Sequence, residues 1–275
     1  MMTRPVARPT RRSTGNRLFS RFHLSRRLSA GQNTSIVTTP ARLIAIEGLD
    51  GSGKGTQLER LAASLRQSGL EVATAAFPAY DAGIVGRKVG EYLDGRLGRV
   101  PTDRPWLPAL LFATDRYEQR ERLLESARTA DFLLIDRYVA SNVAYQGAGL
   151  ERPALEEFAA WVEELEFGVF ALPRPDLQLY LRMPPETARR LVLQKAKRSY
   201  TDRGLDLYEE DADRQTRSGE IYEWLAATDF GGPWRIVDCA GDGGEPRARR
   251  EVTDDLRAVL HDLAGEAADT SDPAG

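Results

Sequence analysis

The stretch Glu47-Gly48-Leu49-Asp50-Gly51-Ser52-Gly53-Lys54-Gly55-Thr56-Gln57 decides how this chain folds. A short apolar run, residues 43–46, precedes it, and leucines at helical spacing follow it. The order is therefore strand, glycine-rich loop and helix. Such a loop directs backbone N–H groups at an anion, and the start of the helix adds positive potential. Because Lys54 can reach the β- and γ-phosphates, the stretch predicts a site for a nucleoside triphosphate.

The loop departs from the usual phosphate-binding pattern at one position. That pattern has Ser or Thr directly after the lysine to hold magnesium, whereas this chain has Gly55 and carries the hydroxyl one residue later, on Thr56. Direct ligation of the metal by a hydroxyl is left open. A glycine-rich turn without function is the alternative, and the spacing, the lysine and the strand–helix context oppose it. The residues expected to bind ATP are Gly48, Leu49, Asp50, Gly51, Ser52, Gly53, Lys54, Gly55 and Thr56.

Length and composition favour one large α/β domain. The 275 residues are enough for a sizeable core, and no apolar run approaches the roughly 18 residues of a membrane span. A single cysteine, Cys239, excludes an internal disulfide and is typical of a reducing, cytoplasmic compartment. It ends an apolar run, which predicts packing rather than reactivity.

Charge is distributed unevenly along the chain. Residues 1–42 contain nine arginines and no acid, while the rest contains 29 basic and 41 acidic residues, a net charge of −12. An arginine- and serine-rich start resembles an organelle transit peptide or a nucleic-acid-binding arm. Two plainer interpretations are a disordered extension and a misplaced start, with translation beginning near Val37. We favour these and expect a disordered basic extension over 1–40, a kinase domain over 41–265 and a disordered tail over 266–275.

The remaining pattern alternates strands and helices. Strands are predicted at 71–77, 132–136, 177–181 and 234–237, and helices at 84–93, 107–128, near Ser141, at 154–167, at 185–198, up to 227 and at 246–263. Together with the first strand, this alternation predicts a five-stranded parallel sheet flanked by helices on both faces. Ligands of such sheets bind beyond the carboxyl ends of the strands.

Three groups of residues follow these strands or lie on a helix between them. They are Phe77-Pro78-Ala79-Tyr80, Leu111-Phe112-Ala113-Thr114-Asp115-Arg116 and Asp136-Arg137-Tyr138-Val139-Ala140-Ser141-Asn142, with Tyr145-Gln146 one turn later. Arginine grips phosphate, aromatic rings stack on a base, and asparagine offers both a donor and an acceptor. A lone Asp-Arg pair is more often a surface ion pair, but two such pairs with Phe and Asn nearby favour a nucleoside monophosphate pocket.

With the glycine loop, these groups resemble thymidylate kinases, which phosphorylate dTMP with ATP. The resemblance covers about residues 43–260, and the run 136–142 is similar above all to actinobacterial members. It implies a P-loop nucleoside monophosphate kinase fold with a short lid, a Mg²⁺ cofactor and a homodimer, with no specific nucleic acid or membrane partner. The dTMP-binding residues that it implies are Asp50, Phe77, Tyr80, Phe112, Arg116, Arg137, Ser141, Asn142, Tyr145 and Gln146.

The resemblance also implies individual roles. Phe112 stacks on thymine, Arg116 and Asn142 read its polar edge, and Arg137 with Tyr80 holds the phosphate. Tyr145 lies near the 2′ carbon of the sugar, and Asp50 lies near the 3′-hydroxyl and the metal, which it holds directly or through water. Many members have arginine where this chain has Ala79, which places more of the phosphate affinity on Arg137. Gly55 is typical of adenylate kinases instead.

Phosphoryl transfer requires cancellation of negative charge. Some thymidylate kinases supply an arginine from the loop, where this chain has Ser52. The polar segment 195–206 contains Lys195, Lys197, Arg198 and Arg203, which predicts a closing lid rather than a solvated helix end. The expected catalytic residues are therefore Lys54, Arg137, Arg198 and Arg203.

Three other functions stay open at this point. An adenylate or cytidylate kinase is suggested by Gly55, although Asp50 and the run 136–142 disfavour it. A regulator that binds ATP without transferring phosphate is opposed by the lid arginines. A nucleic-acid-binding protein is opposed by the acidic body of the chain.

Overall fold

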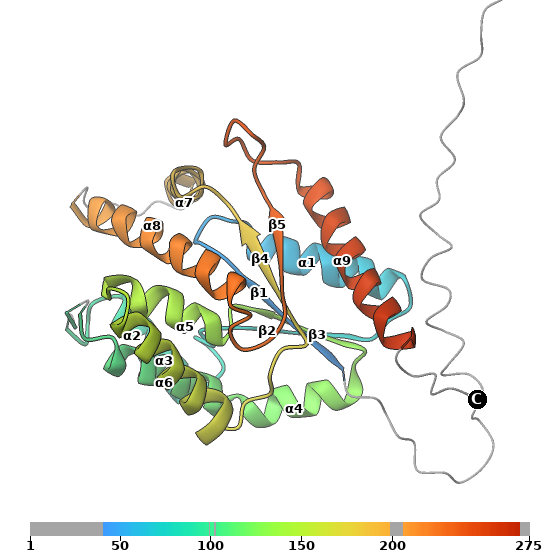
Figure 1. Ribbon diagram of the computed structural model, residues 1–275, viewed down its shortest axis with the longest axis horizontal. Helices are drawn as coiled ribbons and strands as arrows, with labels where there is room; N and C mark the ends of the chain where they lie inside the picture. Colours follow the sequence, from blue (N-terminus) through green and yellow to red (C-terminus); the bar gives the residue numbers. More distant parts are fainter. Residues whose placement is uncertain (1–40, 99, 102, 199–205, 270–275) are drawn as a thin grey trace, which may run out of the picture.

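A single parallel sheet forms the centre of the protein. The computed structural model describes residues 41–98, 100–101, 103–198 and 206–269 (Figure 1). The sheet contains five strands in the order β2-β3-β1-β4-β5, which confirms the predicted five-stranded parallel sheet. Their bounds are β1 (Arg42–Glu47), β2 (Val72–Ala76), β3 (Phe132–Asp136), β4 (Leu177–Arg182) and β5 (Trp234–Asp238). Because β1 lies between β3 and β4, the loop that follows β1 emerges at the middle of the sheet.

Helices cover both faces of this sheet (Figure 1). On one face α1 packs beside α9, and on the other α5 packs beside α8. The helices are α1 (Lys54–Gln67), α2 (Ile84–Leu93), α3 (Trp106–Glu118), α4 (Arg120–Thr129), α5 (Val139–Gln146), α6 (Ala154–Glu163), α7 (Pro185–Arg198), α8 (Asp206–Ala227) and α9 (Arg249–Asp269), with a short 3₁₀ turn (Gly147–Gly149) after α5.

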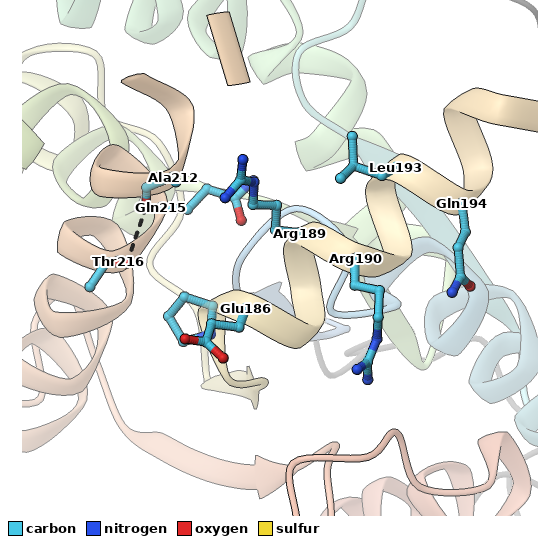
Figure 2. Close-up of a pocket in the computed structure, with 9 residues that line it drawn as sticks. Glu186, Arg189, Arg190, Leu193, Gln194, Ala212, Gln215 and Thr216 are labelled. Atoms are coloured by element: carbon cyan, nitrogen blue, oxygen red, sulfur yellow. Dashed lines mark hydrogen bonds between the residues drawn. The ribbon is translucent and has the colours of Figure 1, made fainter. Parts of the chain in front are cut away.

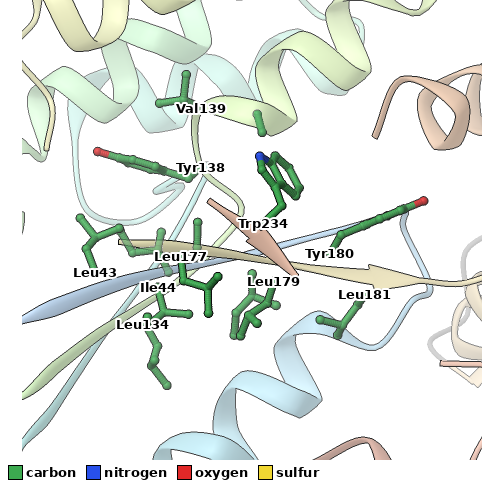
Figure 3. Close-up of a cluster of buried hydrophobic side chains, with 14 of the residues drawn as sticks. Leu43, Ile44, Leu134, Tyr138, Val139, Leu177, Leu179, Tyr180, Leu181 and Trp234 are labelled. Atoms are coloured by element: carbon green, nitrogen blue, oxygen red, sulfur yellow. The ribbon is translucent and has the colours of Figure 1, made fainter. Parts of the chain in front are cut away.

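The core extends through both sheet faces. Every residue of β3 except the last is buried, as is every residue of β4 except the last, whereas the edge strands β2 and β5 are only partly buried. Figure 3 shows Tyr138 and Val139 on one side of the strands and Leu134 and Leu179 on the other. Burial on both faces explains why the central strands are continuous apolar runs.

Several boundaries differ from the sequence predictions. The helix predicted over 107–128 is two helices, α3 and α4, which meet at Gln119. The N–H of this buried residue donates to Arg116 O at the end of α3, and its carbonyl oxygen accepts from Leu123 N at the start of α4. The helix predicted over 154–167 ends at Glu163 and continues as a π-helical turn (Glu164–Val169).

The last helix also differs at both ends. It begins at Arg249 rather than at 246, because Arg247 N donates to Cys239 O and Ala240 pairs with Pro246, which keeps this segment extended. It ends at Asp269 rather than at 263. Residues 270–275 and the predicted extension 1–40 lie outside the described residues, and the disordered tail stays a prediction.

A buried carboxylate joins three elements at the end of β1. Glu47 accepts hydrogen bonds from Tyr138 N at 2.8 Å, Ser141 Oγ at 2.5 Å and Tyr222 Oη at 3.0 Å. Burial raises the pKa of this carboxyl even though all three donors and Arg137 act to lower it. Glu47 therefore ties β1 to the start of α5 and to α8.

No helix within the described ranges is long and apolar enough to cross a membrane. Cys239 is buried, as its position at the end of an apolar run predicts, and burial raises the pKa of its thiol to about 12. This environment suits packing and opposes reactivity.

Candidate active site

The glycine loop connects β1 to α1 with a backbone that few other residues adopt. Gly51 has φ 89°, and a Cβ at this position would lie 2.1 Å from the carbonyl oxygen of Ala188 on α7. Gly53 has φ 91° and precedes the first residue of α1, which is Lys54. The loop therefore needs glycine both for its conformation and for its close contact with α7.

Lys54 is folded back onto this loop. Its Nζ donates to the carbonyl oxygen of Leu49 at 2.8 Å, and the side chain is buried. Burial, together with the positive charge of Arg137, lowers the pKa of the Lys54 ammonium to about 8, although Asp50 and Asp136 act in the opposite direction. A bound phosphate would supply the negative charge that this buried cation lacks.

Arg137 brings the end of β3 to the same loop. It has φ 63°, a left-handed conformation that is uncommon outside glycine, and this turn directs Tyr138 N at Glu47. Its Nη2 donates to Asp50 Oδ1 at 2.6 Å, and its guanidinium lies 4.7 Å from the centre of the Tyr145 ring. The loops that follow β1 and β3 are thus joined by one ion pair.

Asp50 and Tyr145 complete this junction. Burial works against ionisation of Asp50, but Arg137 and Lys54 hold the pKa of its carboxyl below the ordinary value. The Tyr145 hydroxyl accepts a hydrogen bond from Asp50 N at 2.9 Å. A negative carboxylate next to two buried cations can position a metal–phosphate group, which is the role that the sequence resemblance gives Asp50.

A pocket of about 290 Å³ opens beside this junction. Tyr145 and Gln146 of α5, Pro108 of α3, Tyr92 of α2 and Arg214 of α8 are among its lining residues. Phe112 lies one helical turn beyond Pro108 and contacts the edge of the Tyr92 ring, with the ring centres 6.3 Å apart. These aromatic walls are suited to a flat base.

Arg214 was not predicted from the sequence as part of this pocket. Its Nη2 donates to the carbonyl oxygen of Tyr145 at 3.0 Å and to Gln146 Oε1 at 3.5 Å. No motif surrounds it, and an exposed arginine in the middle of a helix gives no sequence signal.

The other predicted dTMP residues lie in three different environments. Arg116 and Asn142 are buried and do not line the pocket, and both bond Glu166. The hydroxyl of Ser141 donates to Glu47 and is hydrogen-bonded to Tyr222. It also lies 3.4 Å from Arg137 Nη1 as an acceptor, so it helps to hold Arg137 in place.

The Phe77–Tyr80 segment follows β2. Phe77 is buried against Tyr138, with ring centres 6.3 Å apart, and a cis bond joins it to Pro78. Asp115 Oδ2 accepts from Ala79 N at 2.9 Å, which holds the segment against α3. Tyr80 is left exposed at the mouth of the site.

A second cavity, of about 520 Å³, lies between α7 and α8. Figure 2 shows Arg189 extending toward Gln215 of α8, whereas Arg190 points away from it. Arg189 Nε and Gln215 Oε1 are buried and have no hydrogen-bond partner among the described residues. The cavity thus lies beside α7, the helix that leads into the predicted lid, and these two polar atoms face each other across it.

The predicted lid itself is only partly described. Lys195, Lys197 and Arg198 belong to the last turns of α7, but their side chains lie outside the described part of the chain, as does all of Arg203. The catalytic roles of Arg198 and Arg203 stay predictions.

Comparison with known proteins identifies the family. Residues 46–229 match the family model described as thymidylate kinase. The thymidylate kinase of Mycobacterium tuberculosis (strain CDC 1551 / Oshkosh) is 40% identical over 202 residues, which cover 74% of this chain and 94% of that protein. The chain belongs to the thymidylate kinase family. Thymidylate kinase from Danio rerio is 26% identical over 221 residues, covering 80% of this chain and 90% of the relative.

A solved structure supports the same fold. Thymidylate kinase from Candida albicans superposes with a TM-score of 0.59 at 24% identity, covering 80% of this chain and 91% of that one. The enzyme therefore phosphorylates dTMP in an ATP-dependent reaction, and the predicted actinobacterial resemblance agrees with the mycobacterial match.

Two acidic residues of this kinase were missing from the predicted site. Asp136 Oδ1 is buried and has no hydrogen-bond partner among the described residues, and burial raises the pKa of this carboxyl despite Lys54 and Arg137. An acid at the end of a buried apolar strand was the available signal. Glu166 had no such signal, because it belongs to a π-helical turn that the sequence pattern does not reveal.

The low pKa of Lys54 predicts how ATP affinity changes with pH. Below pH 8 the side chain is already protonated, whereas above it ATP binding must take up a proton to pair with the phosphates. We expect the Kd for ATP to rise roughly 10-fold or more between about pH 7.5 and about pH 9.5. Calorimetric titration in two buffers of different ionisation enthalpy would measure both the affinity and the proton uptake.

Lys54→Arg provides the matched control, because arginine stays charged over this whole range. Its affinity for ATP should be lower but flat with pH. A wild-type Kd that does not change between these pH values would contradict the prediction.

Proposed function

We propose that the chain transfers the γ-phosphate of ATP to dTMP, giving dTDP and ADP, at the junction of the β1 and β3 loops. The single observation that carries this proposal is the Arg137–Asp50 ion pair of 2.6 Å. It joins the loop expected to hold ATP to the arginine expected to hold the dTMP phosphate. Donor and acceptor phosphates would then meet between Lys54 and Arg137.

The acceptor site extends from this junction into the pocket between α3 and α5. Phe112 would stack on thymine, while Arg116 and Asn142 would read its polar edge. Tyr145 would lie beside the sugar, because its ring is held between Arg137 and Tyr222. Tyr80 would add a hydroxyl to the phosphate.

The chemistry requires charge stabilisation rather than a base. An oxygen of the dTMP phosphate, already ionised at neutral pH, attacks the γ-phosphorus, and the bond from that phosphorus to the oxygen bridging it to the β-phosphorus breaks. Lys54 and Arg137 are cations held in place before the substrates arrive, so they stabilise the developing charge with little reorganisation. Arg198 and Arg203 would add charge from the lid.

A screen of nucleoside monophosphates tests the proposal. ADP release should be fastest with dTMP, about 10- to 200-fold less efficient with dUMP, which lacks one methyl group, and roughly 10⁴-fold less efficient with dCMP, which mispairs with Asn142. A coupled ADP assay measures all of them. AMP or CMP turnover equal to that of dTMP would favour an adenylate or cytidylate kinase instead. No ADP release with any monophosphate would favour a regulator.

We also propose that Mg²⁺ is held by Asp136 and Asp50. The Oδ1 atom of Asp136 is buried and has no hydrogen-bond partner among the described residues. A side chain at position 55 would place its Cβ 3.4 Å from Asp136 Oδ2, so Gly55 leaves this carboxylate open toward the phosphate site. Carboxylates and phosphates are the ligands that Mg²⁺ prefers, and the ion would neutralise charge on the β- and γ-phosphates.

Asp136→Asn should raise the Mg²⁺ concentration needed for half-maximal rate by about 10–100-fold, because a carboxylate that orients the metal or its waters is lost. Magnesium titration of the dTMP-dependent rate measures this. Glu125→Gln, at an exposed ion pair with Arg128, is the control and should change nothing. An unchanged magnesium requirement in Asp136→Asn would exclude Asp136 from the metal site.

An apolar stripe on α3 supports a homodimer. Leu107 is 71% exposed and Leu110 is 40% exposed, and Tyr117 continues the stripe two turns later. Exposed side chains of this size at helical spacing are typical of an interface between copies. We also infer a cytoplasmic location, which the single buried cysteine supports.

Leu110→Glu should convert the dimer to a monomer, because the interface would bury an unpaired charge. Sedimentation velocity measures the change. Ile236→Glu, at an exposed position on the edge strand β5, should stay dimeric. A wild-type protein that sediments as a monomer at micromolar concentration would rule out the proposal.

A further inference from the structure

Three polar side chains are buried together beneath the acceptor pocket. Arg116 comes from α3, Asn142 from α5 and Glu166 from the π-helical turn after α6. Arg116 and Asn142 are each 2% exposed, and Glu166 is fully buried. Burying a carboxylate this deeply is costly unless it is paired and hydrogen-bonded, so the position of Glu166 requires a physical explanation.

Glu166 holds Arg116 in a fork. It accepts from Arg116 Nε at 2.5 Å and from Nη2 at 2.7 Å, which uses both carboxylate oxygens. Burial alone would lower the pKa of Arg116, but Glu166 reverses this effect and raises it. The fork fixes the plane of the guanidinium and leaves Nη1 as the nitrogen without a bond to Glu166.

Glu166 also determines which way the Asn142 amide points. Asn142 Nδ2 donates to Glu166 Oε1 at 2.9 Å and to the carbonyl oxygen of Ala109 at 3.0 Å. Both partners are acceptors, so the amino group must face them and the Oδ1 atom must face the other way. That Oδ1 is buried and has no hydrogen-bond partner among the described residues.

The result is a fixed donor beside a fixed acceptor. An unpaired buried acceptor is unfavourable unless a ligand supplies a donor. A thymine edge offers the matching pattern: its N3–H donates to Asn142 Oδ1, and its O4 accepts from Arg116. Cytosine reverses both positions, because its N3 accepts and its N4 amino group donates.

We propose that Glu166 is the positioning residue that sets base selectivity in this enzyme, by locking the Asn142 amide with its oxygen toward the base and holding Arg116 beside it. This inference rests on the proposed placement of thymine next to Arg116 and Asn142. Glu166 touches neither the base nor the phosphates, so it acts through its two partners.

Glu166→Gln tests the proposal with almost no change of shape. Glutamine has one acceptor oxygen and one amino group, so the three donors that face Glu166 can no longer all be satisfied. With the amino group at the Oε2 position Arg116 Nε loses its acceptor, and with it at the Oε1 position Asn142 Nδ2 loses one and the Asn142 oxygen can turn toward the new donor. We expect the KM for dTMP to rise at least about 10-fold, with kcat and the KM for ATP within about threefold of the wild type. The ratio of kcat/KM for dTMP to that for dCMP should fall at least about 10-fold.

A matched control is available three residues earlier in the chain. Glu163 forms an exposed ion pair with Arg174 at 2.7 Å, so Glu163→Gln makes the same chemical change outside the pocket. It should leave every kinetic constant and the dTMP to dCMP ratio unchanged.

Selectivity separates positioning from a merely structural role. If folded Glu166→Gln loses efficiency with dTMP and dCMP in parallel, the ratio is preserved and the proposal is overturned. Should this variant fail to fold, Glu166→Asp keeps the charge on Arg116 but withdraws the carboxylate from Asn142, and a ratio unchanged from wild type would overturn the proposal equally. Wild-type enzyme that does not phosphorylate dTMP would instead overturn the proposed function.

Discussion

The buried carboxylate of Glu47 is the interaction on which the active site depends. It lies at the end of the central strand and accepts hydrogen bonds from α5 and α8 at once. Because one of its donors is the backbone N–H of Tyr138, it fixes the turn in which Arg137 adopts its left-handed conformation. The ion pair between Arg137 and Asp50 follows from that turn. An apolar side chain at this position would remove the acceptor that all three donors share and would leave the Tyr138 N–H without its partner.

The free enzyme concentrates positive charge before its substrates arrive. Lys54 and Arg137 are both largely buried, and the acids near them, Asp50 and Asp136, do not fully compensate Lys54, whose pKa falls to about 8. Stability and function conflict here, because the folded protein tolerates an incompletely balanced cation so that an anion can bind to it. Preorganised charge of this kind avoids reorganisation during phosphoryl transfer.

Much of the fold was predictable from the sequence because the central strands are buried on both faces. Continuous apolar runs gave β1, β3 and β4, and the turn residues gave α2 and α7 with the correct ends. The break at Gln119 and the π-helical turn at Glu166 could not be predicted in this way. No Pro or Gly marks the break at Gln119, and Glu166 is buried through bonds to Arg116 and Asn142, which are distant in sequence and leave no local pattern.

The site was predictable to the same extent and for a similar reason. Lys54, Asp50 and Arg137 follow buried strands, so their positions at the sheet edge are fixed by topology. Arg116 and Asn142 were singled out from the sequence and their roles stay predictions, but Glu166, which both of them bond, was not singled out, since an acid in an amphipathic helix normally faces solvent. The bonding of Ser141 to Glu47 likewise depends on the spacing of β1 and α5, which no motif encodes.

The contact between Gly51 and Ala188 has a mechanical consequence. The loop backbone lies so close to the first turn of α7 that a single methyl group would not fit between them. The two backbones are therefore in direct contact, with no side chain of the loop between them. Movement of α7 toward the sheet would press on the phosphate loop, and a loop stiffened by bound nucleotide would in turn resist tilting of the helix. Occupancy of the donor site and the orientation of the helix leading to the lid are thus coupled by steric contact alone.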